Sequence, residues 1–258
     1  MLRNISFSAL NLWLLCGECC RRTYFETPIP PGIAMWRGRS FHETVEVNHI
    51  QKVTSNVDLK LDYMQDYCRD QYVHGIRDEG FYLPLDEKPQ KNKLLNKGLN
   101  EAVTAVGVYK KDIAPKLQPK TVEQYIRTDI GLDMPISGRI DLEDVDNVIT
   151  DFKVGKRKPK NWEHTDLQPT FYALLKYMTE KKLPKFLFNI IPSNGIVQEL
   201  QTTRSFDDFT ILLRYIKLFI KDLKAGIFRP APPGHWKCQP KWCGYYYTCK
   251  YCQSNLNF

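Results

Sequence analysis

No stretch of about eighteen consecutive apolar residues occurs in the sequence, so no segment is long enough to cross a membrane as a helix. Internal repeats and low-complexity segments are absent too, and the 258 residues are expected to form one domain, 1–258. The apolar run from Leu10 to Cys16 is too short for a lipoprotein signal, and bulky Leu15 stands where such signals need a small residue. We therefore predict a cytoplasmic protein, in whose reducing environment the eight cysteines indicate metal ligands rather than disulfides.

Acidic residues are in deficit. The sequence has 29 aspartates and glutamates against 37 lysines and arginines, a formal net charge of +8. This balance favours a polyanionic partner, with an ordinary basic soluble protein as the alternative. The sequence gives no indication of the oligomeric state.

The most informative stretch begins with two short runs of β-branched and apolar residues, Ser137–Leu142 and Val148–Val154. The acidic connector between them ends in Asn147, and this combination predicts a β-hairpin. Because side chains alternate along a strand, Asp151 and Lys153 are expected on the same face.

Asp141 lies on the partner strand of this hairpin. Charged side chains inside an apolar run are costly to bury unless they are paired or bind a metal. Two carboxylates and a lysine at one position of a sheet suit a divalent cation with oxygen ligands. An ordinary ion pair on a hairpin is the alternative.

A basic run and a helix follow the hairpin. The run is suited to phosphate contacts, with a solvated loop as the alternative, and consists of Lys156, Arg157, Lys158 and Lys160. Asp166 is predicted to cap a helix from Leu167, in which Gln168 and Tyr172 lie four residues apart and share a face.

Three motifs now stand in a fixed order: Gly138-x-x-Asp141, Asp151-x-Lys153 and Gln168-x-x-x-Tyr172. Together they resemble the PD-(D/E)XK nuclease superfamily, and within it the RecB-type exonucleases of phages and CRISPR-associated systems. The proline of the superfamily's name is absent, since Ile140 precedes Asp141, but RecB-type members commonly lack it. N-terminal and C-terminal segments extend the resemblance over nearly the whole chain, apart from residues 53–111, which we expect to be a helical insertion.

The resemblance implies a mixed α/β fold. The expected core is restriction-endonuclease-like, with a central mixed sheet flanked by helices, N-terminal helices and a C-terminal Cys-rich tail. Helices are predicted over 34–52, 57–77, 101–110 and 206–225, with a helix or a turn plus helix over 5–24. Strands are predicted over 122–129, 186–192 and 196–203, with a turn at Ser193-Asn194-Gly195 and an exposed connection over 83–97.

The resemblance also implies an activity, that of a metal-dependent DNA exonuclease acting on linear DNA ends in phage or prokaryotic recombination. Mg²⁺ or Mn²⁺ is expected at Asp141, Asp151, the backbone carbonyl of Phe152 and His42, which matches the family's Gly-x-x-x-His context. Lys153 is expected to orient or activate water, and Gln168 and Tyr172 to support the catalytic site and contact the DNA backbone.

Relatives often work with a single-strand annealing recombinase. The polarity of degradation, the strand preference and the balance between exonuclease and endonuclease activity are not indicated by the sequence. A non-catalytic DNA-binding subunit with a nuclease fold is the alternative, although the intact Asp141, Asp151 and Lys153 argue against it.

The cysteines complete the expectation. An iron–sulfur cluster, of the 4Fe-4S type in relatives, is implied at Cys16, Cys238, Cys243 and Cys249, with Cys20 as second choice for the N-terminal ligand. It would join residues 1–36 to residues 226–258 as a staple, because the tail has little regular structure of its own. A zinc site is the alternative, since Cys16 and Cys19, and Cys249 and Cys252, form C-x-x-C pairs. Cys68 is expected to be buried or inert.

Overall fold

A single mixed sheet forms the centre of the computed structural model, which describes residues 2–192 and 195–253. Its strands within these residues are β1 (Ile5–Ser6), β2 (Pro119–Thr128), β3 (Ile136–Asp144), β4 (Val148–Val154), β5 (Lys185–Ile191) and β6 (Gln198–Thr202). β3 pairs with β1 in parallel and with β2 and β4 in antiparallel fashion. β4 pairs with β5 in parallel, and β5 pairs with β6 in antiparallel fashion. The mixed α/β fold is therefore as predicted.

The hairpin between β3 and β4 forms where the sequence predicts it. The Asp144 carboxylate accepts hydrogen bonds from the backbone N–H groups of Asp146 and Val148, at 2.9 and 2.8 Å. Asn147 takes the left-handed conformation with φ of 60°, which asparagine tolerates better than most residues. The connector therefore closes the turn with its own acidic side chain.

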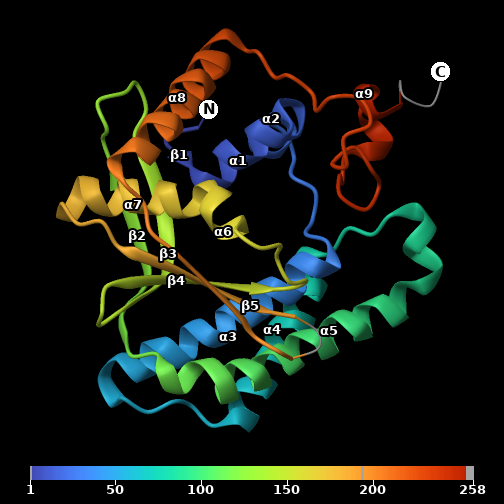
Figure 1. The fold of residues 1–258 in the computed structure, drawn as a ribbon. Helices are drawn as coiled ribbons and strands as arrows, with labels where there is room; N and C mark the ends of the chain where they lie inside the picture. The colour runs from blue at the N-terminus through green and yellow to red at the C-terminus, as the bar shows by residue number, and fades with distance from the viewer. Residues whose placement is uncertain (1, 193–194, 254–258) are drawn as a thin grey trace.

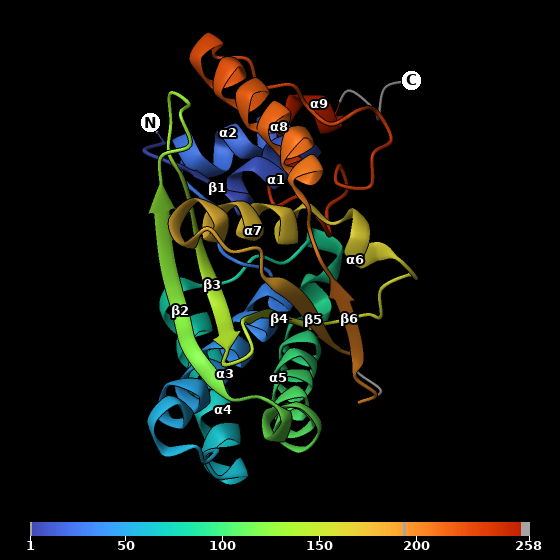
Figure 2. The ribbon, with the colours of Figure 1, turned by 60° about the vertical axis from the view of Figure 1, so that its left-hand side comes forward.

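Helices cover both faces of the sheet (Figures 1 and 2). One face packs against α1 (Phe7–Leu15), α7 (Leu167–Glu180) and α8 (Phe206–Ala225), with Leu10, Phe171 and Phe219 among the buried residues. The other packs against α3 (Ile33–Ser55), α4 (Leu61–Glu79) and α5 (Lys91–Val108), with Phe41, Tyr109 and Phe152 buried there. The short α2 (Gly17–Phe25), α6 (Trp162–Thr165) and α9 (Lys250–Gln253) complete the α-helices of the described residues.

The predicted helices are found, with one correction. Residues 83–97 are not simply an exposed connection, because α5 begins at Lys91 after a 3₁₀ segment, Leu85–Gln90. Pro89 suggests a break for the whole stretch, yet proline just before a helix is compatible with its first turn. Residues 53–111 contribute α4 and α5, whose Met64, Cys68 and Ala105 are buried in the core below the sheet.

The end of α8 is also as expected, since Gly226 caps it in the left-handed conformation with φ of 64°. Ser193 and Asn194 of the turn predicted between β5 and β6 lie outside the described residues. No helix of the described part of the chain is both long and apolar enough to span a membrane.

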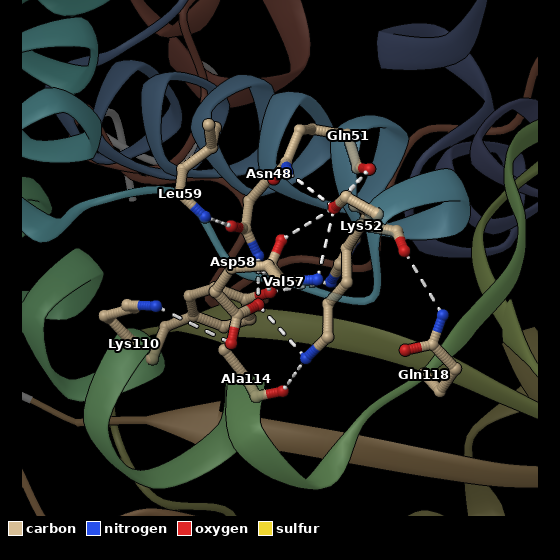
Figure 3. A network of polar contacts seen from close by, with 12 residues as sticks. Asn48, Gln51, Lys52, Val57, Asp58, Leu59, Lys110, Ala114 and Gln118 are labelled. Carbon is tan, nitrogen blue, oxygen red and sulfur yellow. Dashed lines mark hydrogen bonds and ion pairs between the residues drawn. The ribbon is translucent and has the colours of Figure 1, made fainter.

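A buried polar network fixes α3 against the connection to α4 and against the segment that follows α5 (Figure 3). The Lys52 ammonium lies 3.1 Å from the Asp58 carboxylate and donates to the carbonyl of Ala114 at 2.6 Å. The Asn48 side-chain amide donates to Asp58 at 2.9 Å and to the Tyr109 hydroxyl at 3.0 Å. Because buried charges are tolerated only when paired and hydrogen-bonded, this arrangement permits little sliding of α3.

Candidate active site

Asp151, Lys153 and Gln168 form one hydrogen-bonded group between β4 and the first turn of α7. The Gln168 amide nitrogen donates to Asp151 Oδ1 at 2.6 Å, and the Lys153 ammonium donates to Gln168 Oε1 at 3.2 Å. Lys153 Nζ also lies 2.9 Å from Asp151 Oδ2. As predicted, Asp151 and Lys153 therefore lie on the same face of β4.

His42 and Asp141 form a second pair beside this group. His42 is on α3 and its Nδ1 lies 3.3 Å from Asp141 Oδ2 on β3. Burial opposes the charged forms of both side chains, but their hydrogen bond and attraction outweigh it: the pKa of His42 is raised and the pKa of Asp141 is lowered. The imidazole and the carboxylate therefore stabilise each other's charged forms.

Burial governs the charges of the first group. It raises the pKa of Asp151, and the neighbouring Asp141 charge adds to the effect, against the attraction of Lys153. Burial would lower the pKa of Lys153, but the Asp151 carboxylate raises it above the ordinary lysine value. The lysine is consequently an ammonium at neutral pH, fixed beside a carboxylate.

Three contacts set the position of α7. Asp166 caps the helix by accepting a hydrogen bond from the Gln168 N–H at 2.8 Å. Farther along, the Lys176 ammonium meets the Glu143 carboxylate at 2.6 Å, with each side chain only 2% exposed. Gly138 is required between them, because a Cβ there would lie 2.9 Å from the ring of Tyr172. Tyr172 therefore packs directly on the backbone of β3.

Glu123 is a further acidic side chain beside the site, and the sequence marks it only weakly as a candidate functional residue. It lies opposite Asp141, between the register pairs Val122–Leu142 and Gln124–Ile140. Its φ of 49° is unusual for a glutamate, and such strain is found often at functional sites. Burial, together with the charges of Asp141 and Glu46, raises the pKa of Glu123 to about 7. A charged residue inside a strand is the only sequence signal for it.

Comparison with known families gives a match over residues 4–253 to the model of the PD-(D/E)XK nuclease superfamily. The chain belongs to the PD-(D/E)XK nuclease superfamily. No curated protein matches the sequence. Among solved structures, the crystal structure of a "Putative exonuclease" from Eubacterium rectale is similar, with a TM-score of 0.59 and 10% identity over 98% of this chain and 88% of that chain.

A second structure, of a protein named SSO0001, matches 84% of this chain and 94% of that chain at 15% identity, with a TM-score of 0.38. At these identities the similarity to the Eubacterium rectale protein concerns the fold. The matched family model spans all the motifs on which the sequence prediction depended, including His42, Asp141, Asp151 and Lys153.

Nucleases of the PD-(D/E)XK superfamily generally use Mg²⁺ or Mn²⁺, and the donors of this nuclease suit such ions. Carboxylates come from Asp141 and Asp151, an imidazole from His42 and a backbone carbonyl from Phe152. Asp151 Oδ2 is buried and lies 2.9 Å from the Lys153 ammonium, so a metal ion bound there would share this oxygen with the lysine. Within the described residues, no group of three or more His, Cys, Asp or Glu side chains is arranged about a metal position, either at this site or among the cysteines. Lys153 and Gln168 both contact Asp151.

The basic run after β4 lies on the loop between β4 and α6. Lys156, Arg157 and Lys160 are exposed. The backbone N–H of Lys158 donates to Gln198 Oε1 at 2.9 Å, and its ammonium lies 4.6 Å from the ring centre of Trp162. The loop is thus fixed at Lys158, while its other basic side chains face solvent.

The start of α2 and the C-terminal tail of this nuclease meet at a cavity, which we call the cysteine cage. Four of its cysteines are those expected for the cluster, and Cys19 and Cys252 of the zinc alternative also line it; the six are Cys16, Cys19, Cys238, Cys243, Cys249 and Cys252. All six are free thiols. Gly17 must be a glycine here, because a Cβ would lie 2.8 Å from the carbonyl of Arg229.

Hydrogen bonds single out two of the cage sulfurs. Cys16 Sγ accepts from the backbone N–H groups of Cys19 and Ala231, at 3.4 and 3.3 Å. A hydrogen bond from the Cys19 thiol lowers the pKa of Cys243 to about 6, despite burial and with help from the charge of Lys237. Such contacts orient sulfur ligands in metal sites.

Cys20, the second choice for the N-terminal ligand, does not line the cage. Its thiol donates to the carbonyl of Ala9 at 3.6 Å, and its side chain is buried in the core between α1, α7 and α8. Cys68 is buried below the sheet, as expected.

Proposed function

We propose that this protein is a metal-dependent DNA exonuclease, which hydrolyses phosphodiester bonds at the ends of linear DNA. The observation that supports this best is the convergence of Asp141, Asp151, Lys153 and His42 with the amide of Gln168. DNA is the substrate that a nuclease fold implies. The net charge of +8 favours association with such a polyanion.

Mg²⁺ or Mn²⁺ would be held by Asp141, Asp151, His42 and the backbone carbonyl of Phe152. When bound, such an ion offsets negative charge on the phosphate and lowers the pKa of water. Lys153 supplies a fixed ammonium that offsets charge developing on the phosphate and orients the attacking water. Gln168 holds Lys153 and Asp151 in register, and Tyr172 supports the site from α7.

The loop after β4 would contact the DNA backbone. Lys156, Arg157, Lys158 and Lys160 follow directly on the strand that carries Asp151 and Lys153, so phosphates near the scissile bond lie within their reach. Contacts of this kind position a strand without reading its sequence.

The cysteine cage would hold an iron–sulfur cluster of the 4Fe-4S type, bound by Cys16, Cys238, Cys243 and Cys249. This cluster would be structural and would join residues 1–36 to residues 226–258, where regular structure is sparse. A zinc ion in the cage is the alternative, which the presence of Cys19 and Cys252 on the same cavity favours.

The biological setting that fits is phage or prokaryotic recombination in the cytoplasm, with a single-strand annealing recombinase as partner. Removal of nucleotides from one strand at a DNA end would leave the other strand unpaired for such a partner. Residues 53–111 would act as a helical insertion that completes the core beneath the sheet.

The experiment compares end-labelled linear DNA with a closed circle, in the presence of Mg²⁺ or Mn²⁺. We expect the linear DNA to be degraded from its ends and the circle to persist. Asp151→Asn and Lys153→Met should abolish cleavage while DNA binding persists. The matched controls are Asp146→Asn and Lys185→Met, which alter exposed charges on the hairpin connector and on β5 and should cut DNA like wild type. Equal rates for all four variants would show that the site is elsewhere.

A further inference from the structure

The C-terminal tail presents two half-exposed tryptophans side by side. Trp236 is 48% exposed and Trp242 is 49% exposed, whereas Trp36 is 1% exposed in the core. The rings of Trp236 and Trp242 meet edge to face, with centres 5.9 Å apart and planes at 86°. Single exposed apolar residues are ordinary, but two large aromatic rings in contact on the surface form a patch of the kind that interaction sites use.

Basic groups surround this pair. The Lys241 ammonium lies 5.8 Å from the ring centre of Trp242, and the Lys237 ammonium donates to the Trp242 carbonyl at 2.8 Å. His235 packs against Trp236 with ring centres 5.5 Å apart. We call His235, Trp236, Lys237, Lys241 and Trp242 the aromatic platform.

The platform is held in one shape by its own backbone. Cys238 N donates to His235 O at 2.9 Å, and Trp242 N and Cys243 N both donate to Gln239 O at 2.9 Å. Cys238 and Cys243, which flank the turn, line the cysteine cage. The tryptophans are therefore presented by a rigid turn.

We propose that the aromatic platform binds unpaired nucleotides of the DNA strand by stacking, a role that rests on the proposed function and extends it to the substrate strand. Aromatic faces combined with cations suit single strands, because every base offers a π-face and every nucleotide a phosphate. Inside a duplex the base faces are covered by their neighbours. Two perpendicular rings cannot both stack on bases of a straight duplex, whereas a flexible single strand can turn to meet both.

A chain of contacts connects the aromatic platform to the end of β4, the β-strand that carries Asp151 and Lys153. The Tyr82 hydroxyl donates to the carbonyl of Pro240 at 2.9 Å, and Tyr82 pairs with Gly32, the residue before α3. In the second turn of α3, Arg37 donates to the carbonyl of Val154, the last residue of β4, at 3.2 Å. In Figure 1 the C-terminal tail, drawn in red, lies beside the start of α3. A single DNA strand bound on the aromatic platform would thus approach the basic loop that follows β4.

The experiment measures binding of a labelled oligothymidylate and of a blunt DNA hairpin in EDTA, where metal-dependent cleavage cannot proceed. Trp242→Ala and Trp236→Ala should each weaken oligothymidylate binding by roughly fivefold to a hundredfold, the range seen when one stacking residue is lost. Trp242→Phe should retain most of the affinity. Tyr125→Ala, which removes an aromatic residue that is 57% exposed on β2, is the matched control and should bind like wild type.

Salt separates stacking from charge. Lys241→Gln should reduce the slope of log affinity against log salt by about one, because one phosphate contact is lost. The tryptophan variants should weaken binding at every salt concentration with the slope unchanged. Thermal melting of each variant checks that the fold is intact.

Unchanged oligothymidylate binding in both tryptophan variants would overturn the platform. So would an equal loss for the hairpin duplex, or a change in oligomeric state without a change in DNA affinity, which would mark a protein contact. If the protein binds the oligonucleotide through these tryptophans but cleaves no DNA with Mg²⁺ or Mn²⁺, the platform stands and the nuclease proposal fails.

Discussion

Gln168 joins the two charged groups proposed for catalysis. Its amide nitrogen donates to Asp151 at 2.6 Å and its amide oxygen accepts from Lys153 at 3.2 Å. Its own backbone N–H is held by Asp166 at 2.8 Å, so the side chain starts from a fixed helix terminus. Gln168→Met keeps the length of the side chain and removes both hydrogen-bonding atoms of the amide.

The expected loss follows from these two bonds. A hydrogen bond to a charged group is worth about 1.5–3 kcal/mol, and about 1.4 kcal/mol corresponds to tenfold in rate. If only one bond matters in the transition state, kcat falls about 10- to 100-fold, which is also the usual range for residues that orient metal ligands. Gln168→Glu should be worse at neutral pH, because a third carboxylate beside Asp151 and Asp141 repels its neighbours.

The assay is the initial rate on end-labelled linear DNA over a range of Mg²⁺ concentrations, with melting temperatures measured in parallel. A positioning role predicts a lower kcat together with a higher half-saturating Mg²⁺ concentration. Gln201→Met on β6, an exposed glutamine, serves as control. A Gln168→Met enzyme with wild-type kcat and wild-type Mg²⁺ dependence would refute the reasoning, as would a rate that falls only in proportion to the fraction unfolded.

Two further predictions concern the buried ion pair and the cysteine cage. Lys176→Met leaves Glu143 buried with only Lys120 at 3.3 Å, so the free energy of unfolding should fall by about 3 kcal/mol and the melting temperature by about 6–12 °C. The double variant Glu143→Met/Lys176→Met should recover most of the lost stability. Burial opposes ionisation of Glu143, but Lys176 lowers the pKa of Glu143 below the ordinary 4.5. The wild-type pair therefore contributes its full stability above pH 4.5, and this contribution is lost as the pH falls through the lowered pKa. A double variant without this loss supports the assignment, and a single variant as stable as wild type contradicts it. Anaerobically purified protein should show a broad visible absorbance bleached by dithionite, and Cys243→Ser should cost folding far more than Cys68→Ser; colourless protein with stoichiometric zinc and no iron or sulfide would exclude the cluster.

Local signals made the centre of the fold predictable. The hairpin could be inferred because the acidic connector closes its own turn through Asp144 and Asn147. The capped helix after it could be inferred because Asp166 acts within three residues. Both effects depend on neighbours in sequence, which is the range over which side-chain patterns and turn chemistry operate.

The contact between His42 and Asp141, 99 residues apart in the numbering, was expected only through the family resemblance. Spacing alone does not reveal it, since a histidine on a helix is compatible with many environments. Gly38 in the same motif has no packing reason, because a Cβ there would meet no atom within 4 Å.

Tertiary pairing was out of reach of the sequence. Glu143 and Lys176 look like ordinary surface charges in it, yet each is 2% exposed and they meet at 2.6 Å. The unusual φ of Glu123 also depends on how distant segments pack. These two features arise from the arrangement of layers, and no local pattern encodes them.

The ion pair and the catalytic candidates are parts of one arrangement on α7. Gln168, Tyr172 and Lys176 follow one another at intervals of four residues and so lie along one face of the helix, over a length of about 12 Å. Each contacts the sheet: Gln168 meets Asp151, Tyr172 packs on Gly138, and Lys176 pairs with Glu143. A helix held at three points of a rigid sheet cannot slide or rotate without breaking one of them. Lys176→Met therefore releases one end of α7, the helix that positions Gln168. The substitution should lower kcat of the folded enzyme as well as its stability.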